Sequence, residues 1–412
     1  MFKQALLSTA ICCSLSLPAY AESSDSLKAF FVDDAKVGIS FRYRLEEVDQ
    51  DGFSDDATAS TLRSTLNYKT GSLGDLSAVL EFQDVSLIGD DDFNDTQNGK
   101  TTHPTVADPS NTEVNQAFVS YKGLPDTNIS VGRQHFNFDN IRFVNTNNWR
   151  QLHQTYDAIS VVNKSLPDTE IKYVYTWHLN RSVGGDHYLG DINTELHFLN
   201  AKYSGWKYGS FTAYSYLLDF DKVAFQGNSS RTYGLRFQGK APITDSLNIL
   251  YTAEYATQSD HADNPANFDA DYMLGELGLG GSNWSVKLGY EELEADGTKG
   301  RFTAPLGTGH GFHGWADKFV SVPSTGMEDT HLKMSYTIQS ESYALLNGLK
   351  FDFRYHDFDA NQGSADYGDE IDVKISKKFK DNYSATFIYA DYDADDYATD
   401  TRKWWIILGA KF

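Results

Sequence analysis

Apolar and polar residues alternate along most of this chain. From 37 to 45 every second residue is apolar, and Arg42 and Arg44 stand between Phe41, Tyr43 and Leu45. The same period of two recurs at 284–290, 332–338, 349–355, 371–375 and 383–389. A period of two predicts β-strands that are apolar on one face only. Soluble sandwiches alternate too, but these strands are near the roughly 9–11 residues that a tilted membrane strand requires.

The alternation, together with the turn residues that interrupt it, divides the chain into eighteen expected strands. An even number of strands puts both chain ends on the same side of a closed sheet, which in outer-membrane barrels is the periplasmic side. The strands are expected at 36–48, 59–70, 75–86, 112–123, 127–137, 155–164, 168–181, 193–204, 206–219, 229–240, 244–258, 267–281, 282–294, 328–338, 346–359, 367–380, 381–394 and 401–412.

The connections between these strands alternate in length. Short turns at the periplasmic end and long loops at the external end are typical of outer-membrane barrels. Tight turns rich in Gly, Pro, Asp and Asn are expected at 71–74, 124–126, 166–168, 205, 241–243 and 381–382. Longer polar loops are expected at 49–58, 87–111, 138–154, 182–192, 220–228, 259–266, 295–327, 360–366 and 395–400.

The composition also favours a membrane barrel. Aromatic residues make up 14% of the chain, although its mean hydropathy is only −0.47. Many aromatic residues in a polar chain suit a wall that faces lipid outside and water inside. Backbone groups in a bilayer must pair internally, so a chain without apolar helices has to close into a barrel. We therefore expect an all-β protein, a single antiparallel transmembrane β-barrel over 22–412.

The first 21 residues have the pattern of a cleaved secretory signal peptide. Lys3 is followed by an apolar run over 5–17 and by a small-x-small site at 19–21. The run is too short for a membrane helix, which needs roughly 20 apolar residues. The only cysteines, Cys12 and Cys13, lie in this segment, so no disulfide or cysteine metal site is expected after cleavage. The expected location is the outer membrane of a Gram-negative bacterium.

The end of the chain alternates and finishes on an aromatic residue. Trp404, Ile406, Leu408, Ala410 and Phe412 share one face of the expected last strand. This pattern resembles the C-terminal signature of outer-membrane barrels, which the outer-membrane assembly machinery is thought to read. The alternative is an ordinary edge strand of a sheet.

The parity of the strands indicates which charged side chains face the lumen. A barrel of eighteen strands is wide enough for an aqueous channel, and its inward positions carry more basic than acidic residues. Arg133 is the exception, because it has the parity of the apolar Ile129 and Val131 and needs a bulge or the strand end to turn inward. The arginines expected to line the pore are Arg42, Arg44, Arg63, Arg133, Arg142, Arg150, Arg236 and Arg354. A basic lumen attracts anionic solutes; the alternative is that these charges pair across the wall and only fill the lumen.

The acidic residues concentrate in the loops, and the whole chain carries a net charge of −22. Solvation of external loops explains them; binding of a divalent cation such as Ca²⁺, which could bridge lipopolysaccharide, is the alternative. His310 and His313 are spaced for a metal, but the sequence offers no third ligand, so no metal site is assigned. No nucleotide-binding loop, hydrolase motif or basic stripe for nucleic acid is present.

Two segments resemble one known family. The first contains Gly132-Arg133-Gln134, Arg142, Trp149-Arg150-Gln151 and Tyr156-Asp157-Ala158. The second contains Phe302-Thr303-Ala304-Pro305-Leu306, His310, Gly314-Trp315-Ala316-Asp317-Lys318-Phe319, Pro323, Gly326 and Asp329. Together they resemble the alginate-export family of bacterial outer-membrane barrels, and the Gly-Trp-Ala-Asp-Lys-Phe stretch is the most specific part.

The resemblance implies a monomeric barrel of eighteen strands with an Arg/Lys-lined pore for an anionic uronate polymer. It also implies gating by loops, and here the 295–327 loop is the longest. We expect that loop to fold into the mouth, with His310, Trp315, Asp317 and Lys318 as its gating residues; the alternative is that Trp315 and Asp317 only pin it to the wall. Lipids and lipopolysaccharide are the expected surroundings, with no cofactor and no nucleic acid partner.

The expected function is a passive outer-membrane channel for anionic saccharides, alginate-like by resemblance. Several loops are more acidic than in the exporters of this family, which leaves the direction of transport and the solute open. The first alternative is a porin that is general or specific for neutral sugars or organic acids. A barrel enzyme such as a lipase is a distant alternative, because no Ser-His-acid set is identifiable. A structural or adhesive barrel with a blocked lumen is a further one.

Overall fold

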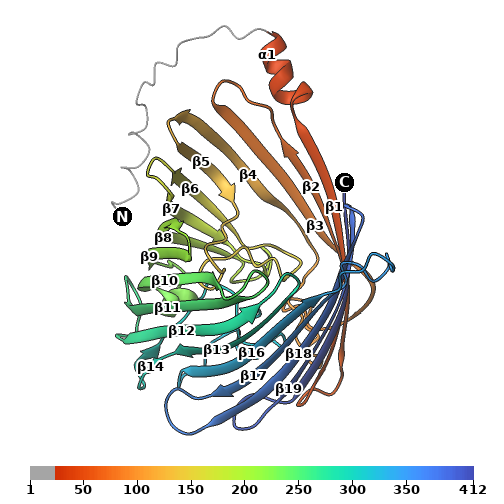
Figure 1. Cartoon of the computed structure of the whole chain (residues 1–412), viewed down its shortest axis with the longest axis vertical. Helices are drawn as coiled ribbons and strands as arrows, with labels where there is room; N and C mark the ends of the chain where they lie inside the picture. Colours follow the sequence, from red (N-terminus) through yellow and green to blue (C-terminus); the bar gives the residue numbers. More distant parts are fainter. Residues whose placement is uncertain (1–23) are drawn as a thin grey trace.

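The computed structural model describes residues 24–412, and its wall is a single closed antiparallel β-sheet of eighteen strands (Figure 1). The expected signal peptide at 1–21 lies outside the described residues. The predicted number of strands is confirmed. The wall strands are β1 Lys36–Gln50, β2 Ala57–Lys69, β3 Leu76–Asp92, β4 Asn111–Leu124, β5 Thr127–Gln134, β6 Thr155–Asn163, β7 Thr169–Asn180, β8 Asp191–Trp206, β9 Gly209–Leu218, β10 Ser230–Pro242, β11 Asn248–Asp260, β12 Asp269–Gly280, β13 Trp284–Leu293, β16 Met327–Thr337, β17 Lys350–Asp359, β18 Asp366–Phe379, β19 Tyr383–Asp393 and β20 Thr401–Lys411.

Pairing of the first strand with the last closes the sheet. β1 pairs with β2 on one side and with β20 on the other, where Tyr43 lies opposite Leu408. Beyond the end of β20, the backbone N–H of Phe412 donates to the carbonyl of Ile39, and the N–H of Ile39 donates back. β20 is therefore not an edge strand, and closure leaves no ladder groups of the wall to be satisfied by lipid.

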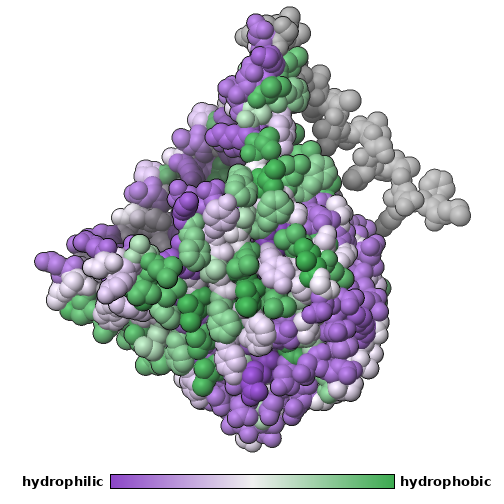
Figure 2. All heavy atoms as spheres, turned by 90° about the vertical axis from the view of Figure 1, so that its right-hand side faces the viewer, coloured by the Kyte–Doolittle hydropathy of each residue, from purple (hydrophilic) through white to green (hydrophobic). Residues whose placement is uncertain are grey.

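The two faces of the wall differ as the period of two predicts. On β10, Leu235 points outward with 67% of its surface exposed, while the neighbouring Arg236 is buried on the inner side. On the facing strands β12 and β13, the outward Leu277 lies directly opposite Leu288. Figure 2 shows apolar side chains gathered across the outer wall between polar regions. Exposed leucines on this scale suit contact with lipid chains rather than with water.

As expected, the connections are short at one end of the barrel and long at the other. Two of them differ from the expectation in detail. The turn between β16 and β17 runs over 338–349 and is longer than the other turns at that end. The external connection between β13 and β16 contains a two-stranded hairpin, β14 (Ala295–Asp296) with β15 (Gly300–Arg301). Before β1 the chain forms a helical turn, α1 (Ser24–Lys28), followed by η1 (Ala29–Asp33). No helix within residues 24–412 is long and apolar enough to cross a membrane.

The hydrophobic core lies inside the barrel. Inward-facing aromatic residues of the wall, among them Tyr156, Tyr272 and Trp405, are fully buried. They are covered by chain from two external connections, at 135–154 and 302–326, which fold back into the ring of strands; Figure 1 shows coil inside the barrel. A third connection, at 93–110, packs in a separate small cluster against β1 and β2. Covering them removes apolar surface from water, and this burial stabilises the fold by roughly 1.5–3 kcal/mol for each large side chain.

The outward position of Leu235 gives a direct test of membrane embedding. Replacing Leu235 with Arg should lower the free energy of unfolding from lipid vesicles by about 2–4 kcal/mol, because a charge then faces hydrocarbon. Val223, which is 81% exposed in an external loop, is the matched control. Val223→Arg should change the stability by less than about 0.5 kcal/mol. Equal effects of the two substitutions on denaturant unfolding would contradict the placement of β10 in lipid.

Candidate functional site: a basic cavity between two inward-folded loops

Arginines of β1 and β2 hold the 135–154 segment against the wall. Arg42 and Arg44 both donate to the carbonyl oxygen of Trp149, at 3.0 and 2.8 Å, and Arg63 donates to the carbonyl of Gln151 at 3.3 Å. Arg44 also forms ion pairs with Glu46 (2.6 Å) and with Asp108 of the 93–110 segment. These guanidinium groups are therefore used to fix the loop, and all three lie on the inner face, where parity predicts them.

The 302–326 segment is held by the opposite kind of charge. The backbone N–H groups of Trp315 and Ala316 donate to the carboxylates of Asp372 and Glu370 on β18, at 3.2 and 2.7 Å. Gly314 has a positive φ of 77°, and a Cβ there would lie 2.2 Å from a carboxylate oxygen of Glu370. Only glycine fits at this position, because both the conformation and the space exclude a side chain.

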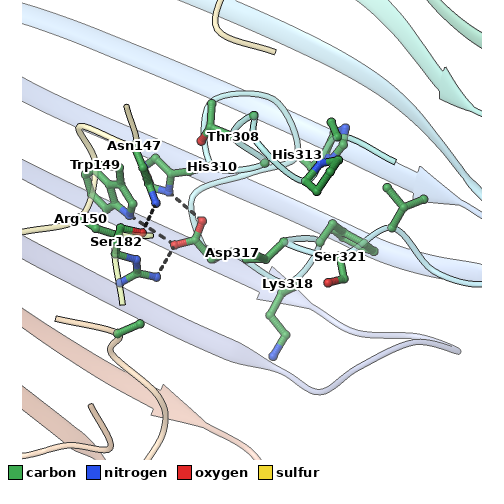
Figure 3. Close-up of a pocket in the computed structure, with 18 of the residues that line it drawn as sticks. Asn147, Trp149, Arg150, Ser182, Thr308, His310, His313, Asp317, Lys318 and Ser321 are labelled. Atoms are coloured by element: carbon green, nitrogen blue, oxygen red, sulfur yellow. Dashed lines mark hydrogen bonds and ion pairs between the residues drawn. The ribbon is translucent and has the colours of Figure 1, made fainter. Parts of the chain in front are cut away.

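One ion-pair cluster joins the two segments. Asp317 accepts hydrogen bonds from Arg150 at 3.2 Å, from His310 Nδ1 at 3.0 Å and from the indole N–H of Trp149 at 3.3 Å. The rings of Trp149 and His310 stack with centroids 3.6 Å apart. Figure 3 shows Asp317 pointing toward these partners. We call these four residues the clasp.

Burial and charge set the protonation of the clasp. Burial alone would raise the pKa of Asp317, but His310 and Arg150 outweigh it and hold that pKa well below its ordinary value. Burial lowers the pKa of His310 to about 4, against the opposing effect of Asp317. The ring is therefore neutral at pH 7, and its Nδ1–H donates to the ionised carboxylate. The clasp thus combines a charged pair, Arg150 and Asp317, with two neutral hydrogen-bond donors.

A cavity of about 660 Å³ lies beside the clasp. Its volume falls in the range of roughly 300–1,000 Å³ that is typical of small-molecule sites. Asp317 is the only acidic residue in its lining. The basic residues in the lining are Arg142, Arg150, Arg181, Arg301, Lys318 and Lys403.

Four of these six cations have no carboxylate partner. Over residues 24–412, Arg142 pairs with Glu291 and Arg150 with Asp317, while Arg181, Arg301, Lys318 and Lys403 form no ion pair. Arg181 and Arg301 donate to the carbonyls of Leu189 and Val322, and Lys318 donates to the hydroxyl of Thr401. Hydrogen bonds to neutral oxygens do not neutralise these charges, and the carboxylates that act on Lys318 and Lys403, such as Glu370, form no ion pair with them. The cavity lining therefore carries an excess of positive charge, which attracts anions.

The residues expected from the sequence fall into three groups. Arg142, Arg150, His310, Asp317 and Lys318 line the cavity. Arg42, Arg44, Arg63 and Arg354 hold the loops, the last by donating to the carbonyl of Gly311 and lying over the ring of Trp315. Trp315 is itself buried against β18 and does not line the cavity, and Arg236 is buried in an ion pair with Glu254.

The prediction that Arg133 lines the pore is wrong, because its side chain faces outward. Its partners across the sheet are Ala117 and Asp157, and its guanidinium pairs with Asp157 at 2.7 Å. The adjacent Gln134 takes the inward position, where it contacts Ser160. The bulge required to turn Arg133 into the lumen does not form there, so the parity it shares with Val131 decides its direction.

Sequence reasoning missed Arg181, Arg301 and Lys403. Arg181 is at the end of the expected strand 168–181, with the outward parity of Tyr173 and Tyr175, but β7 is irregular between Thr176 and His178 and ends at Asn180. Arg301 belongs to the β14–β15 hairpin, outside the wall strands, where parity gives no direction. Lys403 could have been found, because it alternates with Trp404 and Ile406 on β20 and so shares the inner face with Trp405. Of the arginines expected in the pore, the two in the 138–154 loop, Arg142 and Arg150, line the cavity, while Arg42, Arg44, Arg63 and Arg354 of the strands hold the loops.

The closed wall, its apolar outer face and its basic inner cavity define an outer-membrane β-barrel channel. The chain belongs to the alginate-export family, whose model matches residues 33–317. The resemblance seen in the sequence and the expected outer-membrane location are thereby confirmed, while a monomeric state stays a prediction. A comparison with curated proteins gave no match.

Solved structures show the same fold at low sequence identity. Pseudomonas aeruginosa OpdK with vanillate is 13% identical, with a TM-score of 0.72 over 93% of this chain and 99% of that one. P. aeruginosa OccK9 (OpdG) is 15% identical, with a TM-score of 0.71 over the same shares. Acinetobacter baumannii OccAB3 is 14% identical, with a TM-score of 0.69 over 92% of this chain and 100% of that one. At these identities the likeness concerns the fold.

Removing the carboxylate of the clasp should release the 302–326 segment. Asp317→Ala leaves Arg150 buried beside the cavity without its partner, and breaking a buried pair in this way costs about 3–5 kcal/mol. We expect faster proteolysis within 302–326 and an unchanged barrel wall. The control is Lys299→Ala, which breaks an exposed pair with Asp296 in the same external connection and should matter by at most about 1 kcal/mol. Equal protease resistance of Asp317→Ala and the native chain would show that the clasp does not hold the loop.

Lys318 should make the channel sensitive to pH. Burial, followed by repulsion from Lys403, lowers the pKa of Lys318 to about 8. The amine is therefore about 90% charged at pH 7 and about 10% charged at pH 9. The ratio of anion to cation permeability, measured by reversal potential, should fall between these pH values. Lys318→Met should remove most of this fall, whereas Lys164→Met, at a fully exposed lysine paired with Glu170, should retain it. An unchanged pH profile in Lys318→Met would contradict the shifted amine.

Proposed function

We propose that this channel conducts anionic saccharides, of the class of alginate or its uronate oligomers, through the basic cavity. The observation that carries the proposal is the set of four cations without carboxylate partners, Arg181, Arg301, Lys318 and Lys403, around one cavity. Lys403 is buried and the other three are partly buried, and charges taken out of water normally have a partner, because an isolated charge is costly to desolvate. A polyanion in transit would supply the missing carboxylates.

The other lining groups suit a sugar. Thr308, Ser182, Ser321 and Asn228 offer neutral hydrogen-bonding groups for hydroxyls, and the ring of Phe225, with Arg181 lying over it, adds an aromatic surface to the lining. Arg181 and Arg301 present planar guanidinium groups, which match carboxylates with two parallel hydrogen bonds. Carboxylate, hydroxyl and ring recognition are the three contacts that a uronate residue requires.

The clasp is the proposed gate of this pathway. Trp149, Arg150, His310 and Asp317 bridge two loops that both fold into the lumen, so separating them would enlarge the passage. Lys318 follows Asp317 directly and lines the cavity. An anionic solute that reaches Arg150 competes with Asp317 for the guanidinium, which couples arrival of the solute to loosening of the clasp.

A second candidate solute is a small organic acid. One structure with the same fold was solved with vanillate, and the cavity combines cations with the aromatic rings of Phe225 and Phe319. The same cations serve both solutes. A longer oligomer would contact more of them at once, so block that strengthens with the number of uronate residues favours the saccharide.

The proposal is tested by current through single channels in planar bilayers. Uronate oligomers should interrupt the current of the native channel, and Arg181→Gln and Arg301→Gln should each weaken this block about tenfold. A hydrogen bond to a charged group is worth about 1.5–3 kcal/mol, and 1.4 kcal/mol corresponds to a factor of ten.

The control is Arg231→Gln, which removes the same charge from the exposed outer face of β10, where Arg231 contacts Ser259. It should leave the block unchanged. A cation-selective pore that uronates do not block would overturn the proposal. Equal block by monomeric and oligomeric acids would instead favour the organic-acid channel.

A further inference from the structure

Two histidines and an aspartate meet on the inner wall, separate from the lining of the cavity. Asp329 and His331 lie on β16, and His356 lies on β17 directly opposite His331. All three side chains are at most 1% exposed. His356 Nδ1 is 3.0 Å from both carboxylate oxygens of Asp329, and His331 Nδ1 is 3.2 Å from one of them. The three ligand atoms lie within 4.8 Å of one another.

The contact made by His331 Nε2 bears on the protonation of the ring, and so on what its Nδ1 can bind. His331 Nε2 faces a carboxylate oxygen of Glu276 at 3.4 Å. If a neutral His331 used its only N–H to bond Asp329, a lone pair would face the Glu276 oxygen. Two states put a proton on Nε2, where it can donate to Glu276: a protonated imidazolium, which donates from both nitrogens, and a neutral ring with a cation bound at Nδ1. Metal-binding histidines usually donate their other N–H to a carboxylate in this way.

The surroundings fix this arrangement. Glu276 is held by Lys287 and Lys333, each at 3.2 Å, so its charge is balanced and its oxygen is directed at the ring. Gly289 lies opposite His331, and a Cβ at that glycine would be 2.1 Å from Nε2. The ring therefore rests on bare backbone. His356 Nε2 is buried and has no hydrogen-bond partner within the described chain, so no residue there fixes which of its two nitrogens carries the proton.

We propose that Asp329, His331 and His356 bind a divalent transition-metal ion of the Zn²⁺ class. Two imidazoles and one carboxylate suit Zn²⁺, Ni²⁺ or Co²⁺ better than Ca²⁺ or Mg²⁺, which prefer oxygen ligands. Nitrogen-to-oxygen separations near 3 Å fit a common ion at about 2.0–2.2 Å from each atom. The ion joins β16 to β17, next to Glu291, which holds Arg142 and His313 of the two lumen loops.

A second cluster of the same composition is less suited to a cation. Glu81, His135 and His153 also bring their ligand atoms together. The side-chain amide of Asn115 lies among them, at 2.6 Å from Glu81 and 2.9 Å from His153. Arg63 contacts His153 at 2.9 Å, which adds a positive charge where a metal would have to sit. This cluster supplies the matched control for the test.

The test uses the mature barrel, folded in detergent, stripped with EDTA and titrated with Co²⁺ and then Zn²⁺. The native chain should bind one equivalent of Co²⁺ with visible absorption bands, and Zn²⁺ should displace it. Zn²⁺ should also raise the thermal midpoint, because a ligand that binds only the folded state stabilises it. Asp329→Asn and His356→Gln should weaken binding at least tenfold and abolish that rise, while His153→Gln should keep both.

Two outcomes would overturn the proposal. One is a native chain without saturable Co²⁺ or Zn²⁺ binding, which would mean that the two histidines only hydrogen-bond to Asp329. The other is loss of binding in His153→Gln with retention in Asp329→Asn. Because either substitution at the cluster can itself impair folding, X-ray absorption at the zinc edge of the His153→Gln chain, which keeps Asp329, His331 and His356, is the second measurement. Two imidazole ligands support the site, and an all-oxygen shell contradicts it.

Discussion

Closure of the sheet between β1 and β20 is the constraint on which the rest of this structure depends. A closed wall satisfies every backbone group that faces lipid, but a ring of eighteen strands encloses more space than its own side chains can fill. Inward aromatic residues such as Tyr272 and Trp405 would then contact water. The chain covers them with its external connections, and a cavity of about 660 Å³ remains between the loops inside the ring.

Charge is used in two different ways inside the barrel. Most inward cations of the strands are occupied: Arg44, Arg236 and Lys333 each contact a carboxylate, and Arg42 binds loop carbonyls. These contacts are structural, and they correspond to the alternative in which the charges fill the lumen. Within the cavity, the cations without an ion pair come mainly from the loops and strand ends, namely Arg181, Arg301, Lys318 and Lys403. The basic residues of the strands therefore pack the lumen, and those of the cavity attract anions.

The strands and the closed wall could be predicted because each strand contacts lipid on one face and the lumen on the other. Apolar and polar residues therefore alternate along it. The direction of Arg133 followed the same rule, and placing it in the pore was wrong because no bulge overrides its parity. Inward folding of the 295–327 loop could be expected, but the contacts that fix the lumen loops could not, since they join residues far apart in sequence, such as Arg150 and Asp317. The histidine cluster was hidden for a related reason, because only the register of β16 against β17 brings His331 and His356 together.

The 135–154 segment also has a mechanical consequence. On one side of the barrel it is attached to β1 and β2 through Arg42, Arg44 and Arg63, and on the other side Phe143 packs on Tyr214 and Tyr272 of β9 and β12. In an eighteen-strand ring these attachment points lie about half a circumference apart. The segment is thus a strut across the diameter. It resists flattening of the cylinder, so the cross-section of the passage is fixed by the protein rather than by the lateral pressure of the surrounding lipid.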